Sequence, residues 1–453
     1  MRALALIDGE HYPPVVRFAL GELAREYEVV AAAFLGGSEK IDEAGGLDGY
    51  GVPLVTGPAA EQTLRAALAR WAPDVVVDLS DEPVLSSSQR FVLASIALEH
   101  GAVYRGADFS FEPPTAARGG LATPVTPVLG LIGTGKRVGK TAVSADIARR
   151  LKAAGREVVA LAMGRGGPDE PELIFGEQVA LTTADLLALA RQGKHASSDN
   201  YEDAVMSRVT TVGCRRCGGG MAGATFFSNV REGVALADSL GKELLIAEGS
   251  GAAIPPVAFD AAVLVVGAGR GATYVRDYFG PYRIAQADLV VLAAAEEPTA
   301  SAADVAAIRA AIAEQRPELP VLVTGFRPRP LQDVAGHRVF FATTAPEAAV
   351  PRLAEHLATE HGCDVVATSA HLSDRARLRE DMAAHAGNYD LLLTELKAAA
   401  IDVVAAAGED AGVPTVLCDN VPVALDGADL GEHVQRVADL AIARGTARKG
   451  ASR

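Results

Sequence analysis

A glycine-rich segment with two lysines, residues 133–141, has the composition of a phosphate-binding loop. Its sequence is GTGKRVGKT, and it follows an apolar run at 128–132 that predicts a strand and precedes a run at 142–152 that predicts a helix. Glycines let backbone amides surround phosphate oxygens, and a helix N-terminus adds positive potential. We therefore predict a nucleotide-binding P-loop that consists of Gly133, Thr134, Gly135, Val138, Gly139, Lys140 and Thr141.

Side chains in and near this loop are candidates for binding the phosphates and a magnesium ion. Lys140 would reach the β- and γ-phosphates of a nucleotide, and Thr141 would hold Mg²⁺ through its hydroxyl. Glu248 follows the apolar run 244–247, and the end of a neighbouring parallel strand lies beside a P-loop, so its carboxylate would also hold the metal. Asp199 is a further metal candidate, with a helix N-cap as its alternative role.

Two other segments combine arginine with glycine, which indicates a second anionic ligand besides the nucleotide. Residues 163–168 read MGRGGP, and residues 213–220 read GCRRCGGG. Arginine binds phosphate bidentately, and glycine brings backbone amides close to a ligand. The residues that we expect to contact this ligand are Arg165, Gly166, Arg215, Arg216, Gly218 and Gly219. The alternative is that both segments are exposed loops whose arginines are solvated.

Of the four cysteines, Cys214 and Cys217 lie close enough in sequence to suggest zinc binding or redox chemistry. A structural zinc site needs four ligands, and Cys363 and Cys418 are solitary residues far along the chain. A thioredoxin-like motif would open a helix, whereas Cys217 is followed by three glycines. We therefore expect a phosphate-binding loop with incidental thiols, and four cysteines are too few for a disulfide framework.

Composition and charge exclude several classes of protein. The chain has 453 residues, of which 49% are hydrophobic and 22% charged, which excludes wholesale disorder and permits more than one domain core. The net charge of −15 argues against a nucleic-acid or membrane-surface partner, since both are anionic. The N-terminus does not resemble a signal peptide, and no uncharged apolar run reaches about 18 residues, so we expect a cytoplasmic protein.

Short apolar runs alternate with longer alanine-rich amphipathic segments, which is the pattern of an α/β fold with largely parallel sheets. We expect a Rossmann-like domain at 1–125, a P-loop nucleotide-binding core with a mostly parallel sheet at 126–345, and a further α/β region at 346–453. Its basic tail, 444–453, is expected to be disordered. In the first domain, His11 follows a predicted strand and is a candidate general acid or anion contact, with a turn role as the alternative.

The phosphate loop departs from the commonest P-loop spacing, since Thr134 stands where a glycine is usual. This longer form resembles the GTxxxVGKT loop of dethiobiotin synthetase, and LLIAEGSG at 244–251 resembles the VEGAGG segment of that enzyme, where the acid serves Mg²⁺. The other distinctive sequences are DGEHYPPVV at 8–16, AMGRGGPDEPELI at 162–174, GKHASSDNYEDA at 193–204 and GCRRCGGGMAG at 213–223. Together these segments resemble the cyclic 2,3-diphosphoglycerate synthetase family.

The resemblance implies an ATP-dependent ligase that closes 2,3-diphosphoglycerate into its cyclic form and releases ADP and phosphate. The residues that would hold the ATP phosphates and Mg²⁺ are Lys140, Thr141 and Glu248. The residues that would hold the diphosphoglycerate are Arg165, Arg215 and Arg216. Lys136 or Arg137 would steady the transferred phosphoryl group. Relation to the dethiobiotin synthetase branch also implies a homodimer.

Two alternative functions remain open from the sequence. One is a dethiobiotin-synthetase-like ligase that acts on a different phosphorylated or carboxylic acid, and the other is a P-loop nucleotide switch that acts on a protein partner. The two arginine–glycine segments favour a small phosphorylated substrate over a protein. The sequence does not choose between ATP and GTP, because it contains no evident base-specifying NKxD motif.

Overall fold

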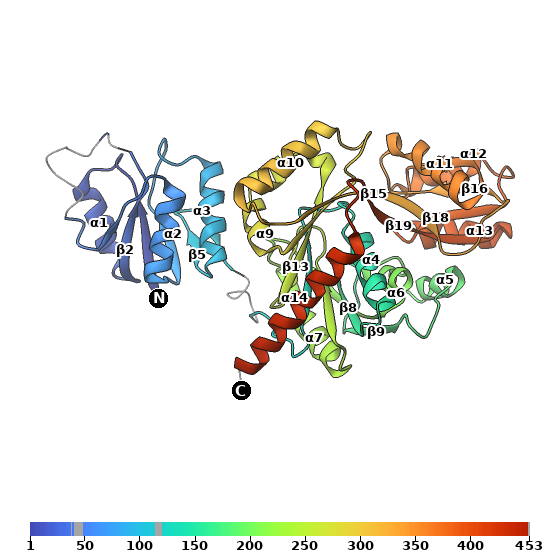
Figure 1. Ribbon diagram of the computed structural model, residues 1–453, viewed down its shortest axis with the longest axis horizontal. Helices are drawn as coiled ribbons and strands as arrows, with labels where there is room; N and C mark the ends of the chain where they lie inside the picture. The colour runs from blue at the N-terminus through green and yellow to red at the C-terminus, as the bar shows by residue number, and fades with distance from the viewer. Residues whose placement is uncertain (38, 40–48, 114–119, 452–453) are drawn as a thin grey trace. The chain divides into compact units, whose positions relative to one another are not determined.

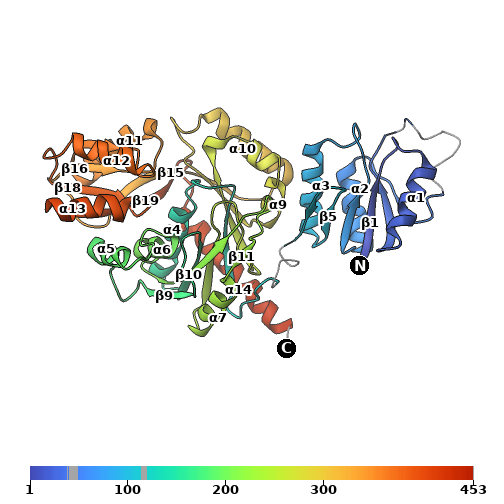
Figure 2. The same cartoon turned by 180° about the vertical axis from the view of Figure 1, so that it is seen from behind.

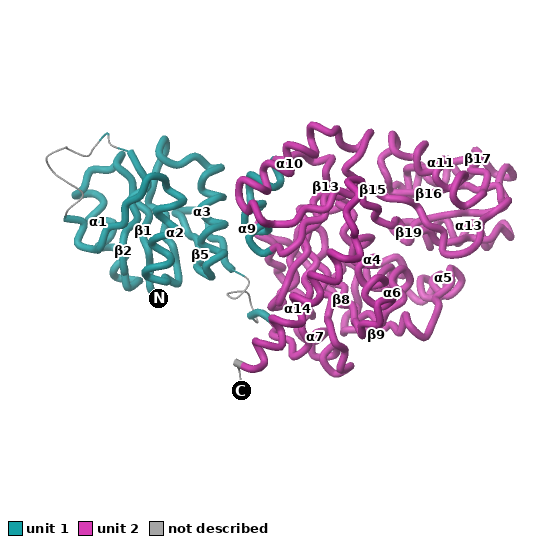
Figure 3. The backbone as a smooth tube through the Cα atoms, viewed as in Figure 1, with its two compact units in different colours: residues 1–121, 273–286 teal, residues 122–272, 287–453 magenta. Residues whose placement is uncertain are grey.

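The computed structural model describes the chain apart from residues 38, 40–48, 114–119 and 452–453. The chain forms two compact units, which are Met1–Leu121 with Thr273–Gln286, and Ala122–Ala272 with Ala287–Arg453 (Figure 3). Among the described residues, no helix is both long enough and apolar enough to cross a membrane.

The first unit has a six-stranded sheet with the order β3-β2-β1-β4-β5-β6, which is parallel except for β6. This order is that of a Rossmann-like sheet, as the sequence predicts. The helices α8 and α9 belong to this unit, where Phe279 packs edge-on against Phe91 and Phe111. The elements are β1 (Arg2–Ile7), α1 (Pro13–Leu23), β2 (Glu28–Phe34), β3 (Leu54–Val55), α2 (Ala60–Trp71), β4 (Val75–Asp78), α3 (Ser87–Glu99), β5 (Val103–Arg105), β6 (Ser110–Phe111), α8 (Thr273–Arg276) and α9 (Gly280–Gln286).

The second unit has a thirteen-stranded sheet with the order β11-β10-β8-β12-β7-β13-β14-β15-β19-β18-β16-β17, and β9 pairs with β10 (Figure 1). Its elements up to residue 270 are β7 (Val128–Gly133), α4 (Lys140–Ala153), β8 (Val158–Gly164), β9 (Glu172–Phe175), α5 (Thr183–Arg191), α6 (Asp199–Ser207), β10 (Thr210–Cys217), β11 (Phe227–Ser228), α7 (Val230–Ser239), β12 (Leu244–Glu248), β13 (Ala261–Gly267) and the short helix η2 (Ala268–Arg270).

Its elements after residue 286 complete the sheet and its helical layers. They are β14 (Leu289–Ala293), α10 (Ala302–Gln315), β15 (Val321–Pro330), β16 (Arg338–Ala342), η3 (Glu347–Ala349), α11 (Val350–His361), β17 (Asp364–Ser369), α12 (Arg375–Ala384), β18 (Leu391–Glu395), η4 (Ala400–Ala405), α13 (Ala406–Ala411), β19 (Thr415–Ala424) and α14 (Leu430–Ala451). The predicted fold class, α/β with a mostly parallel sheet around a P-loop, is confirmed.

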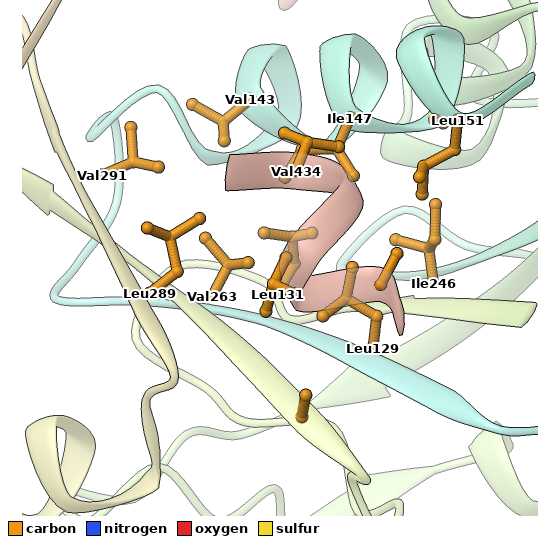
Figure 4. Close-up of a cluster of buried hydrophobic side chains, with 14 of the residues drawn as sticks. Leu129, Leu131, Val143, Ile147, Leu151, Ile246, Val263, Leu289, Val291 and Val434 are labelled. Carbon is orange, nitrogen blue, oxygen red and sulfur yellow. The ribbon is translucent and has the colours of Figure 1, made fainter. Parts of the chain in front are cut away.

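The main core of this unit lies between the parallel strands and two helices, α4 and α14. Val143 and Ile147 of α4 and Val434 of α14 pack over Leu131 and Val263 of the central strands (Figure 4). The central strand β7 is buried along its whole length, because helices cover a parallel sheet on both faces. The C-terminal helix is therefore part of the nucleotide-binding core.

The tail of the chain differs from the disorder expected for 444–453, because α14 continues to Ala451. Two of its basic residues have carboxylate partners on the sheet. Arg448 contacts the two oxygens of Asp260 at 3.0 and 2.9 Å, and Arg444 contacts Asp288 at 2.8 Å. These ion pairs hold the last turns of the helix against the sheet, and residues 452 and 453 lie outside the described part of the chain.

Strand β15 joins two halves of the sheet that run in opposite directions. Its first part, residues 321–323, pairs parallel with β14, and residues 324–330 pair antiparallel with β19. Since β18, β16 and β17 run parallel to β19, their direction is opposite to that of β7. Figure 2 shows β19, β18 and β16 together on one side of β15. The register places the C-terminal half beyond the end of the first half, so the carboxyl ends of the two sets of strands face each other.

Shortening Val434 to alanine is expected to destabilise the second unit, because this side chain is buried between α4 and the sheet. We expect a loss of about 2 kcal/mol in the free energy of unfolding, measured by urea denaturation. Arg436→Ala is the matched control, since Arg436 is exposed on the same helix. Equal stability of the two variants would contradict a core role for α14.

Candidate functional site

A cavity of about 530 Å³ lies between the two halves of the sheet in the second unit. The P-loop lines one side, and residues that follow β16, β17 and β18 line the other. Ligands of open α/β sheets bind at the carboxyl ends of the strands, and here two such edges meet. This cavity is therefore the candidate functional site.

The predicted P-loop connects β7 to α4 and opens into this cavity. The loop residues that line it are Gly135, Lys136, Arg137, Val138, Gly139, Lys140 and Thr141. Gly133 ends β7, and Thr134 is buried behind the loop. Gly139 precedes α4 with φ of +86°, and a Cβ there would lie 2.2 Å from Cζ of Phe326. Only glycine fits this position, so Phe326 of β15 constrains the shape of the loop.

Lys140 and Thr141 both contact Glu248 at the end of β12. Lys140 Nζ lies 3.3 Å from Glu248 Oε1, and the Thr141 hydroxyl donates to the same oxygen at 2.9 Å. The side chains of Lys140 and Glu248 are both buried. A buried charge is strongly destabilising without a partner, so a ligand that draws Lys140 away must also bring a positive charge for Glu248.

Helix α6 places further carboxylates beside Glu248. Within the described part of the chain, no donor reaches either carboxylate oxygen of Asp203 or the Oε2 atom of Glu248. Burial and then the charge of Glu248 raise the pKa of Asp203 well above its usual value, and burial raises the pKa of Glu202 to about 8. Buried carboxylate oxygens without donors are the ligands that a divalent cation would satisfy.

The unpaired Oε2 atom of Glu248, next to the Thr141 hydroxyl, fits a magnesium ion that is held only partly by the protein. The described residues contain no group of three or more His, Cys, Asp or Glu side chains arranged as metal ligands. Mg²⁺ commonly keeps several waters and takes one or two protein ligands plus substrate phosphates. Thr141, Glu248 and Asp199 are suitably placed for this role, since Asp199 lines the cavity and Ser198 occupies the N-cap of α6.

Three cationic side chains come together at Gly251, beside the P-loop. A Cβ at Gly251 would lie 3.7 Å from Arg216 Nη2, 3.8 Å from Arg165 Nη2 and 4.0 Å from Lys136 Cβ. Arg216 is held there because it donates to the Ser250 carbonyl at 2.8 Å. The charge of Arg165, followed by burial, lowers the pKa of Lys136. Because like charges this close repel one another, an anionic ligand would stabilise the cluster.

Arg215, which the sequence analysis assigns to the same ligand, points elsewhere. The segment expected as a loop at 213–220 is strand β10 as far as Cys217, and it pairs with β8 and β9. Neighbouring residues on a strand point to opposite faces. Arg215 accordingly forms an ion pair with Asp169 and donates to the Gly167 carbonyl at 3.0 Å, whereas Arg216 donates to Ser250, which lines the cavity.

The far wall of the cavity holds functional candidates that sequence reasoning did not assign. Lys397 follows β18, and its Nζ lies 3.1 Å from Oε1 of Glu202 on α6. Burial alone would lower the pKa of Lys397, but the charges of Glu202 and Glu395 outweigh it and raise the pKa. The available signal was the sequence TELK at a strand end, which gave no indication that this strand faces the P-loop.

Family models match most of the chain. The N-terminal, P-loop and C-terminal domain models of cyclic 2,3-diphosphoglycerate synthetase match residues 2–112, 128–325 and 330–421. The chain belongs to the cyclic 2,3-diphosphoglycerate synthetase family. The relative of that name from Rubrobacter xylanophilus is 50% identical over 432 residues, which are 94% of this chain and 96% of the relative. The relative of the same name from Methanothermus fervidus is 43% identical over 452 residues, which are 97% of each chain.

Solved structures of other proteins are less similar to this chain in sequence than these relatives are. The ATP complex of LpxK from Aquifex aeolicus matches 70% of this chain and 90% of that chain, with a TM-score of 0.41 and 13% identity.

The remaining predicted contacts lie outside the described residues that line the cavity. A Cβ at Gly166 would meet His195, one at Gly218 would meet Phe226, and one at Gly219 would lie 3.2 Å from Arg216 Nη1. His11 belongs to the first unit of this family member, where its Nδ1 lies 2.8 Å from Oδ1 of Asp8. Asp8 also accepts hydrogen bonds from the backbone of residues 10 and 11, which is the geometry of a turn.

The two cysteines on β10 have different surroundings. Cys214 is buried, and a Cβ at Gly233 would lie only 2.2 Å from its Sγ, whereas Cys217 is exposed. They are three positions apart on a strand, so their side chains leave opposite faces. The two thiols therefore cannot bind the same metal ion.

Thiol titration of the native protein is expected to modify Cys217 alone, because the other three cysteines are buried. The Cys217→Ser variant should then show no fast-reacting thiol, and unfolding the wild-type protein should expose all four. Titration with a chromogenic disulfide measures these numbers. Protection of Cys217 that ends when a chelator is added would instead show that this thiol binds a metal.

Proposed function

We propose that this protein uses ATP to close 2,3-diphosphoglycerate into cyclic 2,3-diphosphoglycerate, with ADP and phosphate as the other products. The observation that supports this most strongly is the meeting of a P-loop with Lys136 and Arg165 at one cavity, where Arg216 lies behind the lining residue Gly251. A nucleotide and a second polyanion would there lie next to each other. Relatives named cyclic 2,3-diphosphoglycerate synthetase match nearly the whole chain.

The P-loop side of the cavity would bind the nucleotide. Lys140 would exchange its contact with Glu248 for the β- and γ-phosphates of ATP. Thr141, Glu248 and Asp199 would hold Mg²⁺, which when bound supplies positive charge that neutralises the phosphates. The N-terminus of α4 and the backbone amides of the loop add further positive potential.

The substrate would bind between the two walls of the cavity. Arg165 and Arg216 would hold one phosphate of 2,3-diphosphoglycerate, and Lys397 on the opposite wall would hold its other end. Lys136 or Arg137 would steady the phosphoryl group during transfer, since both line the cavity beside the P-loop. Glu202 keeps Lys397 in place by an ion pair until an anionic substrate arrives.

Ring closure would proceed in two transfers at phosphorus. An oxygen of one substrate phosphate attacks the γ-phosphorus of ATP, and the bond from that phosphorus to the β–γ bridging oxygen breaks to release ADP. An oxygen of the second substrate phosphate then attacks the activated substrate phosphorus, and the transferred group leaves as inorganic phosphate. No side chain forms a covalent bond, so the protein contributes positioning and charge neutralisation.

Two further features follow from the proposed relationship and reaction. Relation to the dethiobiotin synthetase branch supports a homodimer. Use of ATP supports a cytoplasmic location, and the net charge of −15 opposes a nucleic-acid or membrane partner.

Replacing Lys140 by alanine should lower turnover by about 100-fold or more, because the variant lacks the only P-loop ammonium group placed beside Glu248 among the described residues. Product formation is followed as cyclic anhydride by ³¹P NMR, and circular dichroism verifies the fold. Lys152→Ala is the matched control, since Lys152 lies on the same helix α4 but does not line the cavity. Turnover of Lys140→Ala at the wild-type rate would reject the assignment.

Replacing Arg216 by alanine should raise the KM for diphosphoglycerate about tenfold while the KM for ATP changes about twofold or less. The physical reason is the position of Arg216 in the cationic cluster at Gly251 rather than on the P-loop. Arg215→Ala is a close control, because the adjacent side chain leaves the opposite face of β10 and pairs with Asp169. Equal changes in both KM values for Arg216→Ala would contradict this role.

A further inference from the structure

A second cavity, of about 490 Å³, lies in the same unit and shares no lining residue with the first. Three arginines from different elements line it, which are Arg149 of α4, Arg208 at the C-cap of α6 and Arg329 of β15. None of the described residues that line it is acidic. In a chain with a net charge of −15, such a cavity is a local concentration of positive charge.

The carboxylates near these arginines are too few to neutralise them. Asp419 is buried and shared between Arg149, at 2.6 Å, and Arg329, at 3.2 Å. Asp146 is likewise shared between Arg149, at 3.2 Å, and Arg150, at 2.5 Å. Asp419 and Asp146 thus form ion pairs with three guanidinium groups, those of Arg149, Arg150 and Arg329. Arg208 adds a fourth guanidinium group.

A guanidinium donor at this cavity also remains unsatisfied. In the described part of the chain, Arg329 Nε is buried and has no hydrogen-bond partner. Arg208 is oriented by a hydrogen bond from its Nε to the Gly176 carbonyl at 3.0 Å. The backbone carbonyl of Arg208 accepts a hydrogen bond from Lys152. Buried donors of this kind are normally satisfied by a ligand or by water, and guanidinium donors prefer phosphate oxygens.

We propose that this cavity is a binding site for a small phosphate-bearing anion, held chiefly by Arg208 and Arg329. The volume admits a phosphorylated three-carbon acid or free phosphate. The site does not depend on the reaction at the P-loop. Arg149 and Arg208 nevertheless lie on α4 and at the C-cap of α6, the two helices that begin at the first cavity with Lys140 and Asp199, so the second cavity borders both helices.

Isothermal titration calorimetry of the intact protein tests this site with two probes, inorganic phosphate and 2,3-diphosphoglycerate. Each titration is made with Mg²⁺ and a saturating non-hydrolysable ATP analogue. The wild-type protein is expected to bind one more molecule of at least one probe per chain than Arg208→Gln/Arg329→Gln. The tighter probe shows whether the ligand is free phosphate or a phosphate ester.

The single variant Arg208→Gln keeps the test valid if the double variant does not fold, because Arg208 is exposed and lies outside the Asp419 ion pairs. It should weaken the additional binding event about tenfold. Arg436→Gln, exposed on α14, should bind as the wild type does. Arg216→Ala should weaken only the event at the first cavity, so failure of the proposed reaction would be recognised separately. Equal stoichiometry and affinity in the wild type and Arg208→Gln for both probes would overturn the proposal.

Discussion

The buried ion pair between Lys140 and Glu248 determines how the candidate site is organised. It joins the first residue of α4 to the last residue of β12, so it fixes the P-loop against the neighbouring strand and aligns the Thr141 hydroxyl with the same carboxylate. The desolvation free energy of two buried charges offsets much of their mutual attraction, and the pair is stable only while both partners remain. Such a contact is suited to exchange, in which phosphates replace the carboxylate at Lys140 and a cation replaces the lysine at Glu248.

The reversal of strand direction at β15 gives this site a second wall. Without it, the carboxyl ends of the P-loop strands would face solvent, as in an open sheet that ends at its edge. The antiparallel pairing of β15 with β19 instead turns the C-terminal strands back, so Lys397 and Glu202 meet across the cavity at 3.1 Å. Two polyanions that repel each other can be held together only if cations surround them, and cations from both walls meet that requirement.

The sequence was most informative where structure is local. The strand, loop and helix around residues 128–153 follow from hydrophobic pattern and glycine spacing, and the structure has them at nearly the predicted bounds. The sequence prediction was wrong at β10, where arginine and glycine indicate a loop although the segment begins with the β-branched residues of a strand. The predicted loop therefore did not separate Arg215 from Arg216, which leave opposite faces of that strand. Lys397 could not be assigned, since its position depends on the reversal at β15, which has no local signal. The sequence predicts disorder for the basic tail, because the partners of its arginines, Asp260 and Asp288, are distant in sequence.

Phosphorus NMR of the protein mixed with ATP, Mg²⁺ and 2,3-diphosphoglycerate tests the central claim most directly, namely that one cavity joins a nucleotide to a second phosphorylated substrate. The account predicts that diphosphoglycerate stimulates ADP formation, and that a new cyclic anhydride signal grows in equal amount with the ADP. ATP consumption that diphosphoglycerate leaves unchanged, with no new anhydride signal, would contradict it.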